Sequence, residues 1–161
     1  IEKLIYISSD EVYDTQETLP FTEESTLNPN SLQASTKLAG EFLVKSAFKL
    51  NYTIARLGYT YGPREQTNNF VPRAIQSILN NKELIITSKS DSLSDWTYVE
   101  DICAGLMTIL DKETTTVNQI YNISSGHEFS YLEVFQTITQ ASSLEYCMQV
   151  LLQYLLFFST L

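Results

Sequence analysis

Two adjacent carboxylates, Asp10 and Glu11, are the first residues of this chain whose types and spacing suggest chemistry, in the stretch SSDEVYD at residues 8–14. They follow directly on an apolar run, and like charges at the end of a buried strand repel each other. That repulsion helps to hold one carboxyl protonated beside an ionised one, as paired general acid and base catalysis requires. The structural alternative is that short polar residues after a strand only cap a turn, and on position alone the turn is the more common of the two.

The segments that must position this pair alternate between short apolar runs and longer amphipathic stretches. The short runs, rich in β-forming residues, predict strands at residues 3–8, 52–57, 83–87 and 119–124. The amphipathic stretches predict helices at about residues 31–51, 70–80 and 98–112, and from 131 onwards. Residues 91–95 are predicted to form a turn or loop. In the first helix the apolar residues fall on one stripe, made of Leu32, Ala39, Phe42, Leu43, Ala47 and Leu50.

Helix-start signals support two of these boundaries. Asn30 or Ser31 can cap the first helix, and Ser130 with Glu133 forms a capping box for the last. The strand–helix alternation predicts an α/β fold with a largely parallel sheet. In such folds chemistry takes place at the carboxyl ends of the strands, which is where Asp10 and Glu11 are expected.

Composition excludes several classes of function. The chain has 161 residues, 43% of them hydrophobic, and a formal net charge of −9 with only ten basic residues. Such an acidic chain is a poor match for nucleic acid or for an anionic membrane surface. Cys103 and Cys147 have neither metal-binding nor redox spacing, so we expect reduced thiols in a cytoplasmic protein. His127 is the single histidine, and we expect it to be a loop residue and not a metal ligand.

Several segments, in their order along the chain, resemble one known family. They are SSDEVY, FTEESTLNPNS, ASTKLAGE, RLGYTYGPR, DWTYVEDIC and IYNISSGHEFSYLEV. Together they resemble the extended short-chain dehydrogenase/reductase family, in its NAD-dependent sugar-nucleotide epimerase/dehydratase branch. The resemblance covers residues 1–140 and implies an incomplete Rossmann-like parallel sheet, the C-terminal half of the fold, with the small substrate-binding region of the extended family.

Within that branch, the Asp-Glu pair is typical of the dTDP-glucose 4,6-dehydratases. The resemblance implies that NAD⁺ oxidises the sugar at C4, which acidifies the proton at C5, and that the hydride later returns to C6. It assigns Glu11 as the base at C5 and Asp10 as the acid for the departing C6 hydroxyl. Ser9 and Lys37 complete the implied catalytic set, and Lys37 is also the implied cofactor contact.

The chain departs from the family pattern at the base for the oxidation step. That base is a tyrosine four residues before the lysine, where a neighbouring positive charge lowers its pKa. Position 33, four residues before Lys37, is Gln33. A glutamine cannot act as a general base, and loss of such a group typically removes a factor of about 10² to 10⁴ in rate.

Three further positions differ from the pattern, and one is kept. Tyr59 stands where the family has a substrate-contacting asparagine, and Ser94 replaces an arginine that contacts the nucleotide phosphates. Asp14 replaces a glycine. Asn69 keeps a position that holds the nucleotide end of the substrate, so Asn69 and Tyr59 are the predicted substrate-binding residues.

The glycine-rich loop that binds the pyrophosphate of NAD has no counterpart in the sequence. Five glycines occur, at positions 40, 58, 62, 105 and 126, none with the required spacing. We therefore interpret the chain as the C-terminal part of a longer parent protein, with the NAD-binding half upstream of Ile1. NAD is the implied cofactor, and we expect this chain not to bind it alone.

The resemblance fades near residue 140, and residues 141–161 form an apolar tail. Three interpretations stay open for it: a buried or partner-docking helix, a membrane anchor, and a foreign tail from alternative splicing or a shifted frame. A polar stripe within the tail and the lack of flanking basic residues argue against the anchor.

Three hypotheses for function follow. The first is the C-terminal part of a working NAD-dependent dehydratase acting on a dTDP- or UDP-hexose. The second is a non-catalytic protein that binds a sugar nucleotide or pairs with a homologue, and the third is a non-functional truncated product. We expect this chain by itself to be inactive. The resemblance also implies a homo- or heterodimer formed through the helix at 31–50.

Overall fold

The computed structural model describes residues 2–16, 19–47, 49–86, 92–112 and 115–142. Its first sheet has the order β1-β2-β5, formed by β1 (Leu4–Ser9), β2 (Tyr52–Leu57) and β5 (Gln119–Ile123), and both pairings are parallel. The predicted strands at 3–8, 52–57 and 119–124 are therefore confirmed to within a residue or two. The α/β fold with a parallel sheet is confirmed as well.

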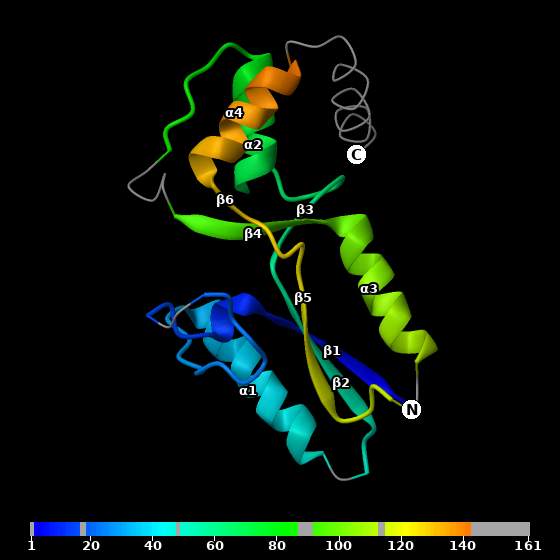
Figure 1. Cartoon of the computed structure of the whole chain (residues 1–161). Helices are drawn as coiled ribbons and strands as arrows, with labels where there is room; N and C mark the ends of the chain where they lie inside the picture. Colours follow the sequence, from blue (N-terminus) through cyan, green and yellow to red (C-terminus); the bar gives the residue numbers. More distant parts are fainter. Residues whose placement is uncertain (1, 17–18, 48, 87–91, 113–114, 143–161) are drawn as a thin grey trace.

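Helices cover both faces of this sheet (Figure 1). On one face lies α1 (Leu32–Ser46), whose Gly40 approaches the ring of Tyr6 in β1. On the other lies α3 (Val99–Asp111), whose Gly105 packs against Ile123 of β5. Glycine allows the close approach in each case, because a Cβ would stand only 1.9 Å from the Tyr6 hydroxyl and 3.0 Å from Ile123 Cγ2.

A second, smaller sheet was not predicted from the sequence. It has the order β3-β4-β6, with β3 (Tyr59–Tyr61) parallel to β4 (Leu93–Tyr98) and β6 (Glu128–Ser130) antiparallel to it. The predicted turn at 91–95 is wrong for residues 93–95, which begin β4. Residues 83–86, predicted as part of a strand, form none. Strands of three residues carry too little alternation to be detected.

Two helices accompany the second sheet and pack against each other (Figure 1). They are α2 (Phe70–Leu79) and α4 (Tyr131–Ser142). The capping box is confirmed, since the Ser130 amide donates to Glu133 Oε2 (2.7 Å) and the Glu133 amide donates to Ser130 Oγ (3.2 Å). Residues 143–161, most of the predicted tail, lie outside the described residues. No helix in the described part of the chain is long and apolar enough to cross a membrane.

The first helix differs from its prediction in extent and in orientation. Ser31 is its N-cap, as one of the two predicted alternatives, but it ends at Ser46 and not near residue 51. Its buried residues are Ala34, Glu41 and Val44. The predicted apolar stripe instead faces outward, with Leu32 83%, Phe42 59% and Leu43 71% exposed. Glu41 lies on the buried face because it meets an arginine there.

Candidate active site

A cavity of about 750 Å³ lies between the carboxyl end of β1, the N-terminal half of α1 and the elements of the second sheet. All the predicted site residues line it: Ser9, Asp10, Glu11, Gln33, Lys37, Tyr59 and Asn69. The sequence placed them on four separate segments, and the fold brings them to one place. Their chemical roles remain predictions.

Asp10 and Glu11 open a single turn of 3-10 helix, η1 (Asp10–Val12), that follows β1 without a break. Ser9 caps it, accepting from the Glu11 amide (3.2 Å) and donating to Asp10 Oδ1 (3.2 Å). Both interpretations of this stretch therefore hold structurally: Ser9 does cap a turn, and that turn presents two carboxyls to a cavity.

The two carboxyls have different surroundings. Burial raises the pKa of Asp10 to about 6 and the charge of Glu11 adds to the shift, against the hydrogen bond from Ser9. Glu11 is exposed, and its Oε2 accepts a hydrogen bond from Ser31 at the start of α1 (3.2 Å). Asp10 thus keeps its proton to higher pH than an ordinary aspartate, mainly through burial and less through repulsion.

Lys37 and Gln33 lie one helical turn apart on α1, and both reach the cavity wall. Lys37 Nζ donates to the carbonyl of Ile7 in β1 (2.9 Å), which fixes the ammonium near the end of that strand. Gln33 therefore occupies the position from which a tyrosine would contact both Lys37 and a bound ligand. A side-chain amide there donates and accepts hydrogen bonds but does not titrate.

The opposite wall is largely aromatic. Tyr59 and Tyr131 line the cavity and pack with Phe70 and Trp96, at ring-centroid distances between 4.2 and 5.7 Å. The Tyr59 hydroxyl accepts from the Phe70 amide (3.4 Å), and burial raises its pKa to about 12. Tyr59 therefore stays protonated and does not replace the missing base.

Two charged residues of this wall were not singled out from the sequence. Arg64 and Glu65 follow the tight turn at Gly62–Pro63, and both line the cavity. The two carboxyl oxygens of Glu65 are buried and have no hydrogen-bond partner among the described residues. Burial raises the pKa of Glu65, and the nearby Asn69 side chain offsets only part of the shift. The signal for both residues was the polar loop between two predicted elements, which carries binding residues often.

A second cavity of about 610 Å³ adjoins the first and shares Asp10, Gly58 and Ser94 with it. Tyr13, Arg56 and Asn122 lie on its wall. The prediction that Glu23 is a solvated surface charge is wrong, because it is half-buried and its Oε1 accepts from the Asn122 amide (2.8 Å). His127 lies in an exposed loop, as expected. Among the described residues, no group of three or more His, Cys, Asp or Glu side chains is placed to hold a metal ion.

Comparison with known proteins identifies the family. The profile of the NAD dependent epimerase/dehydratase family matches residues 1–124. The chain belongs to this family. A low-salt glycan biosynthesis protein of Haloferax volcanii is 33% identical over 144 residues, which cover 88% of this chain and 46% of that protein. A dTDP-D-glucose 4,6-dehydratase of Dictyostelium discoideum is 31% identical, over 88% of this chain and 36% of that enzyme.

Solved structures agree with the sequence comparison. The UDP-glucuronic acid 4-epimerase of Bacillus cereus, solved with UDP-glucuronic acid and NAD, superimposes with a TM-score of 0.82 at 27% identity. The match covers 89% of this chain and 46% of the epimerase. The fold is therefore that of the Rossmann-like extended family, and the chain spans less than half the length of these relatives.

The fit of NAD to the described residues is incomplete. Lys37 stands beside the cavity, where the family resemblance places a cofactor contact. A pyrophosphate cradle needs clustered glycines at a strand-to-helix turn. In this chain Gly40 and Gly105 lie inside helices, and the other three glycines are single residues in separate loops. The described part of the chain therefore supplies no such cradle.

Proposed function

We propose that this chain binds a sugar nucleotide in the larger cavity and presents to it the acid–base pair of a dehydratase-like enzyme. The observation that carries this proposal is the convergence of Asp10, Glu11, Lys37 and Asn69 on one cavity. These residues come from a strand end, a helix and a distant loop, and a purely structural turn at Asp10 would not require the other two. The named relatives act on dTDP-glucose and UDP-glucuronic acid, which supports a nucleotide-linked hexose as the ligand.

The division of roles between the carboxyls follows from their environments. Asp10, with its raised pKa, supplies a proton to a departing hydroxyl, which leaves as water when its C–O bond breaks. Glu11 accepts the proton from the neighbouring carbon, and the electrons of that C–H bond form the new double bond. The adjacent placement of the two residues suits groups on neighbouring carbons.

Gln33 sets the limit of this chemistry. An elimination of this kind requires an acidified C–H bond, and the family pattern acidifies it by a prior oxidation that needs a phenolate-forming tyrosine. With Gln33 at that position, we expect the chain to bind ligand and to show no turnover by itself.

Arg64 is the proposed contact to the diphosphate. Ser94 removes the arginine that the family pattern places before β4, but Arg64 supplies a guanidinium on the same cavity wall. Charge-assisted hydrogen bonds to phosphate contribute about 1.5–3 kcal/mol each. Arg64 compensates for Ser94 if the diphosphate lies along this wall.

Calorimetric titration of the purified chain with dTDP-glucose, UDP-glucuronic acid and NAD⁺ tests the proposal, after circular dichroism has established a cooperative melt. We expect binding of a sugar nucleotide and no binding of NAD⁺ alone. Arg64→Ala should weaken binding at least about tenfold. Arg73→Ala, an exposed arginine of α2 outside the cavity, should not. Absence of a cooperative melt would instead favour the non-functional truncated product.

A second proposal concerns the outer face of α1. Leu32, Phe42 and Leu43 are exposed there, and contiguous exposed apolar side chains mark interaction surfaces. We infer that a second copy of this chain covers this face, as the family resemblance implies. Sedimentation should show a dimer that Leu43→Glu converts to a monomer while the melting temperature holds. A monomeric parent chain, or a dimer unaffected by Leu43→Glu, would reject this surface.

A further inference from the structure

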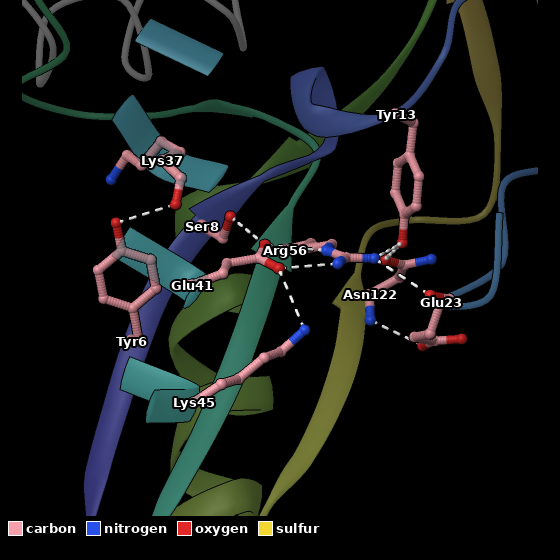
Figure 2. A network of polar contacts seen from close by, with 9 residues as sticks. All are labelled: Tyr6, Ser8, Tyr13, Glu23, Lys37, Glu41, Lys45, Arg56 and Asn122. Carbon is pink, nitrogen blue, oxygen red and sulfur yellow. Dashed lines mark hydrogen bonds and ion pairs between the residues drawn. The ribbon is translucent and has the colours of Figure 1, made fainter. Parts of the chain in front are cut away.

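A buried polar network stands directly behind the Asp10–Glu11 turn (Figure 2). Its centre is an ion pair between Arg56 of β2 and Glu41 of α1, whose side chains are 1% and 0% exposed. Two parallel hydrogen bonds join them, from Arg56 Nη2 to Glu41 Oε2 (2.8 Å) and from Nε to Oε1 (3.0 Å). This two-point geometry fixes the plane of the guanidinium, which a single contact would not do.

Sheet register explains why these residues meet. Ser8, Arg56 and Asn122 are aligned across β1, β2 and β5, so their side chains project from the same face near the carboxyl ends of the strands. Ser8 Oγ donates to Glu41 Oε1 (2.6 Å), which adds a third hydrogen bond to that carboxylate. Glu41 is thus held from two strands at once.

The remaining guanidinium nitrogen of Arg56 reaches the segment that carries the acid–base pair. Arg56 Nη1 donates to the Tyr13 hydroxyl (2.9 Å) and to the carbonyl of Glu23 (3.2 Å), as Figure 2 shows. The Tyr13 hydroxyl donates in turn to Asn122 Oδ1 (2.6 Å), and the Tyr13 ring lies 4.8 Å from the guanidinium carbon. Tyr13 is only 2% exposed.

Tyr13 is also the C-cap of the turn. Its amide donates to the carbonyl of Asp10 (3.1 Å), which closes the three-residue helix η1. A single turn this short has little stability of its own. Its geometry must therefore come from its two ends, the strand β1 on one side and the anchored Tyr13 on the other.

We propose that Arg56 is a positioning residue: held in plane by Glu41, it anchors Tyr13 and so sets the position of Asp10 and Glu11 in the cavity. A buried ion pair is weak evidence for stability, because desolvation offsets most of its attraction. Orientation is what the pair adds here. The proposal deepens the function proposed above and rests on it for its catalytic meaning, but its test uses no ligand.

NMR titration of the labelled aspartate carboxyls, with amide exchange over residues 10–13, tests the anchoring. Tyr13→Phe keeps the ring and removes the hydroxyl that bridges Arg56 and Asn122. We expect the pKa of Asp10 to move from about 6 toward its usual 3.8 as water reaches the loosened turn. Amide exchange in the turn should become about three to ten times faster. Arg56→Lys, which loses the two-point geometry, should do the same or more.

The charged groups that share the walls of both cavities with Asp10 must keep their places for this comparison, and they are Glu11, Lys37, Arg56, Arg64, Glu65, Asp95 and Glu128. Tyr61→Phe is the matched control, since Tyr61 lies on the second sheet and packs with Tyr98. It should leave both readouts unchanged. An unchanged Asp10 pKa and unchanged exchange in a folded Tyr13→Phe variant would overturn the proposal. Loss of the whole fold in Tyr13→Phe would also overturn it, because the hydroxyl would then hold the domain and not the turn.

Discussion

The two walls of the larger cavity are built in opposite ways. On the side of β1 and α1, Asp10 and Lys37 each have a hydrogen-bond partner, and a buried network stands behind the turn that carries Asp10. On the side of the second sheet, the wall is a cluster of four aromatic rings beside Glu65, whose carboxyl has no partner among the described residues.

This difference separates what the chain has preorganised from what it has not. A fully bonded polar network holds side chains in one geometry, as a catalytic or binding group requires. An unpaired buried carboxyl does the reverse, because it carries a desolvation cost that only a new partner removes. The departures from the family pattern at Tyr59 and Ser94 also belong to the second wall and its neighbourhood. The acid–base wall is kept, and the ligand-facing wall has changed.

Removal of the partner of Arg56 should break the first wall with the largest effect. Glu41→Gln leaves the guanidinium buried without a counter-charge, and such losses typically cost about 3–5 kcal/mol of unfolding free energy. Urea denaturation measures this directly. The control is Lys45→Ala, which removes an exposed lysine 4.0 Å from the same carboxylate and should cost less than about 1 kcal/mol. Equal effects would show that the buried pair contributes no more than a surface contact.

The same pair predicts how stability depends on pH. Burial opposes ionisation of Glu41, but hydrogen bonds from Arg56 and Ser8 and the charge of Arg56 outweigh it and hold its pKa below the usual 4.5. The contribution of Glu41 is therefore complete above pH 4.5 and is lost as the pH falls through the lower pKa of the folded state. Glu41→Gln should lose this acid-dependent component.

Asp10→Asn should act in the opposite direction and by less. The folded chain binds the Asp10 proton up to about pH 6, whereas the unfolded chain releases it near 3.8. Ionisation of Asp10 therefore destabilises the fold as the pH rises between these values. At pH 7 the asparagine variant should be more stable by about 1–3 kcal/mol, and at pH 3 the two proteins should match. A variant that is less stable at pH 7 would mean that the ionised carboxyl has a favourable partner.

Sequence reasoning predicted the first sheet well, because its strands are runs of five or six β-forming residues between polar turns. It missed β3 and β6, which have three residues each, and it gave the wrong orientation to α1. The apolar stripe on α1 was easy to detect, but Glu41 takes a buried position in place of a hydrophobic residue. Only the distant Arg56 makes that burial favourable, and no local pattern in a single sequence contains such a pairing.

The site was predicted in its residues and not in its support. Asp10, Lys37 and Asn69 were found through motif order, which encodes their place at strand and helix ends. Arg56, Tyr13 and Asn122 were not, because their importance lies in hydrogen bonds between segments up to 109 residues apart. Glu23 was misjudged for the same reason, since an acidic residue in a loop is usually solvated, and here the loop folds back onto β5.

Glu65→Gln would sharpen the contrast between the two walls with the smallest of these effects. Burial raises the pKa of Glu65, so the ionised carboxylate carries a cost that appears as the pH rises through that pKa. The amide keeps the shape of the side chain and removes the charge, and it should stabilise the fold by about 1 kcal/mol at neutral pH. Glu128→Gln, at an exposed glutamate, should change stability by less than about 0.5 kcal/mol. Denaturation at pH 7 and at pH 4 distinguishes the two, because the gain from Glu65→Gln should shrink at the lower pH. If Glu65→Gln instead destabilises the chain at pH 7, the carboxylate already has a partner, and the second wall is as preorganised as the first.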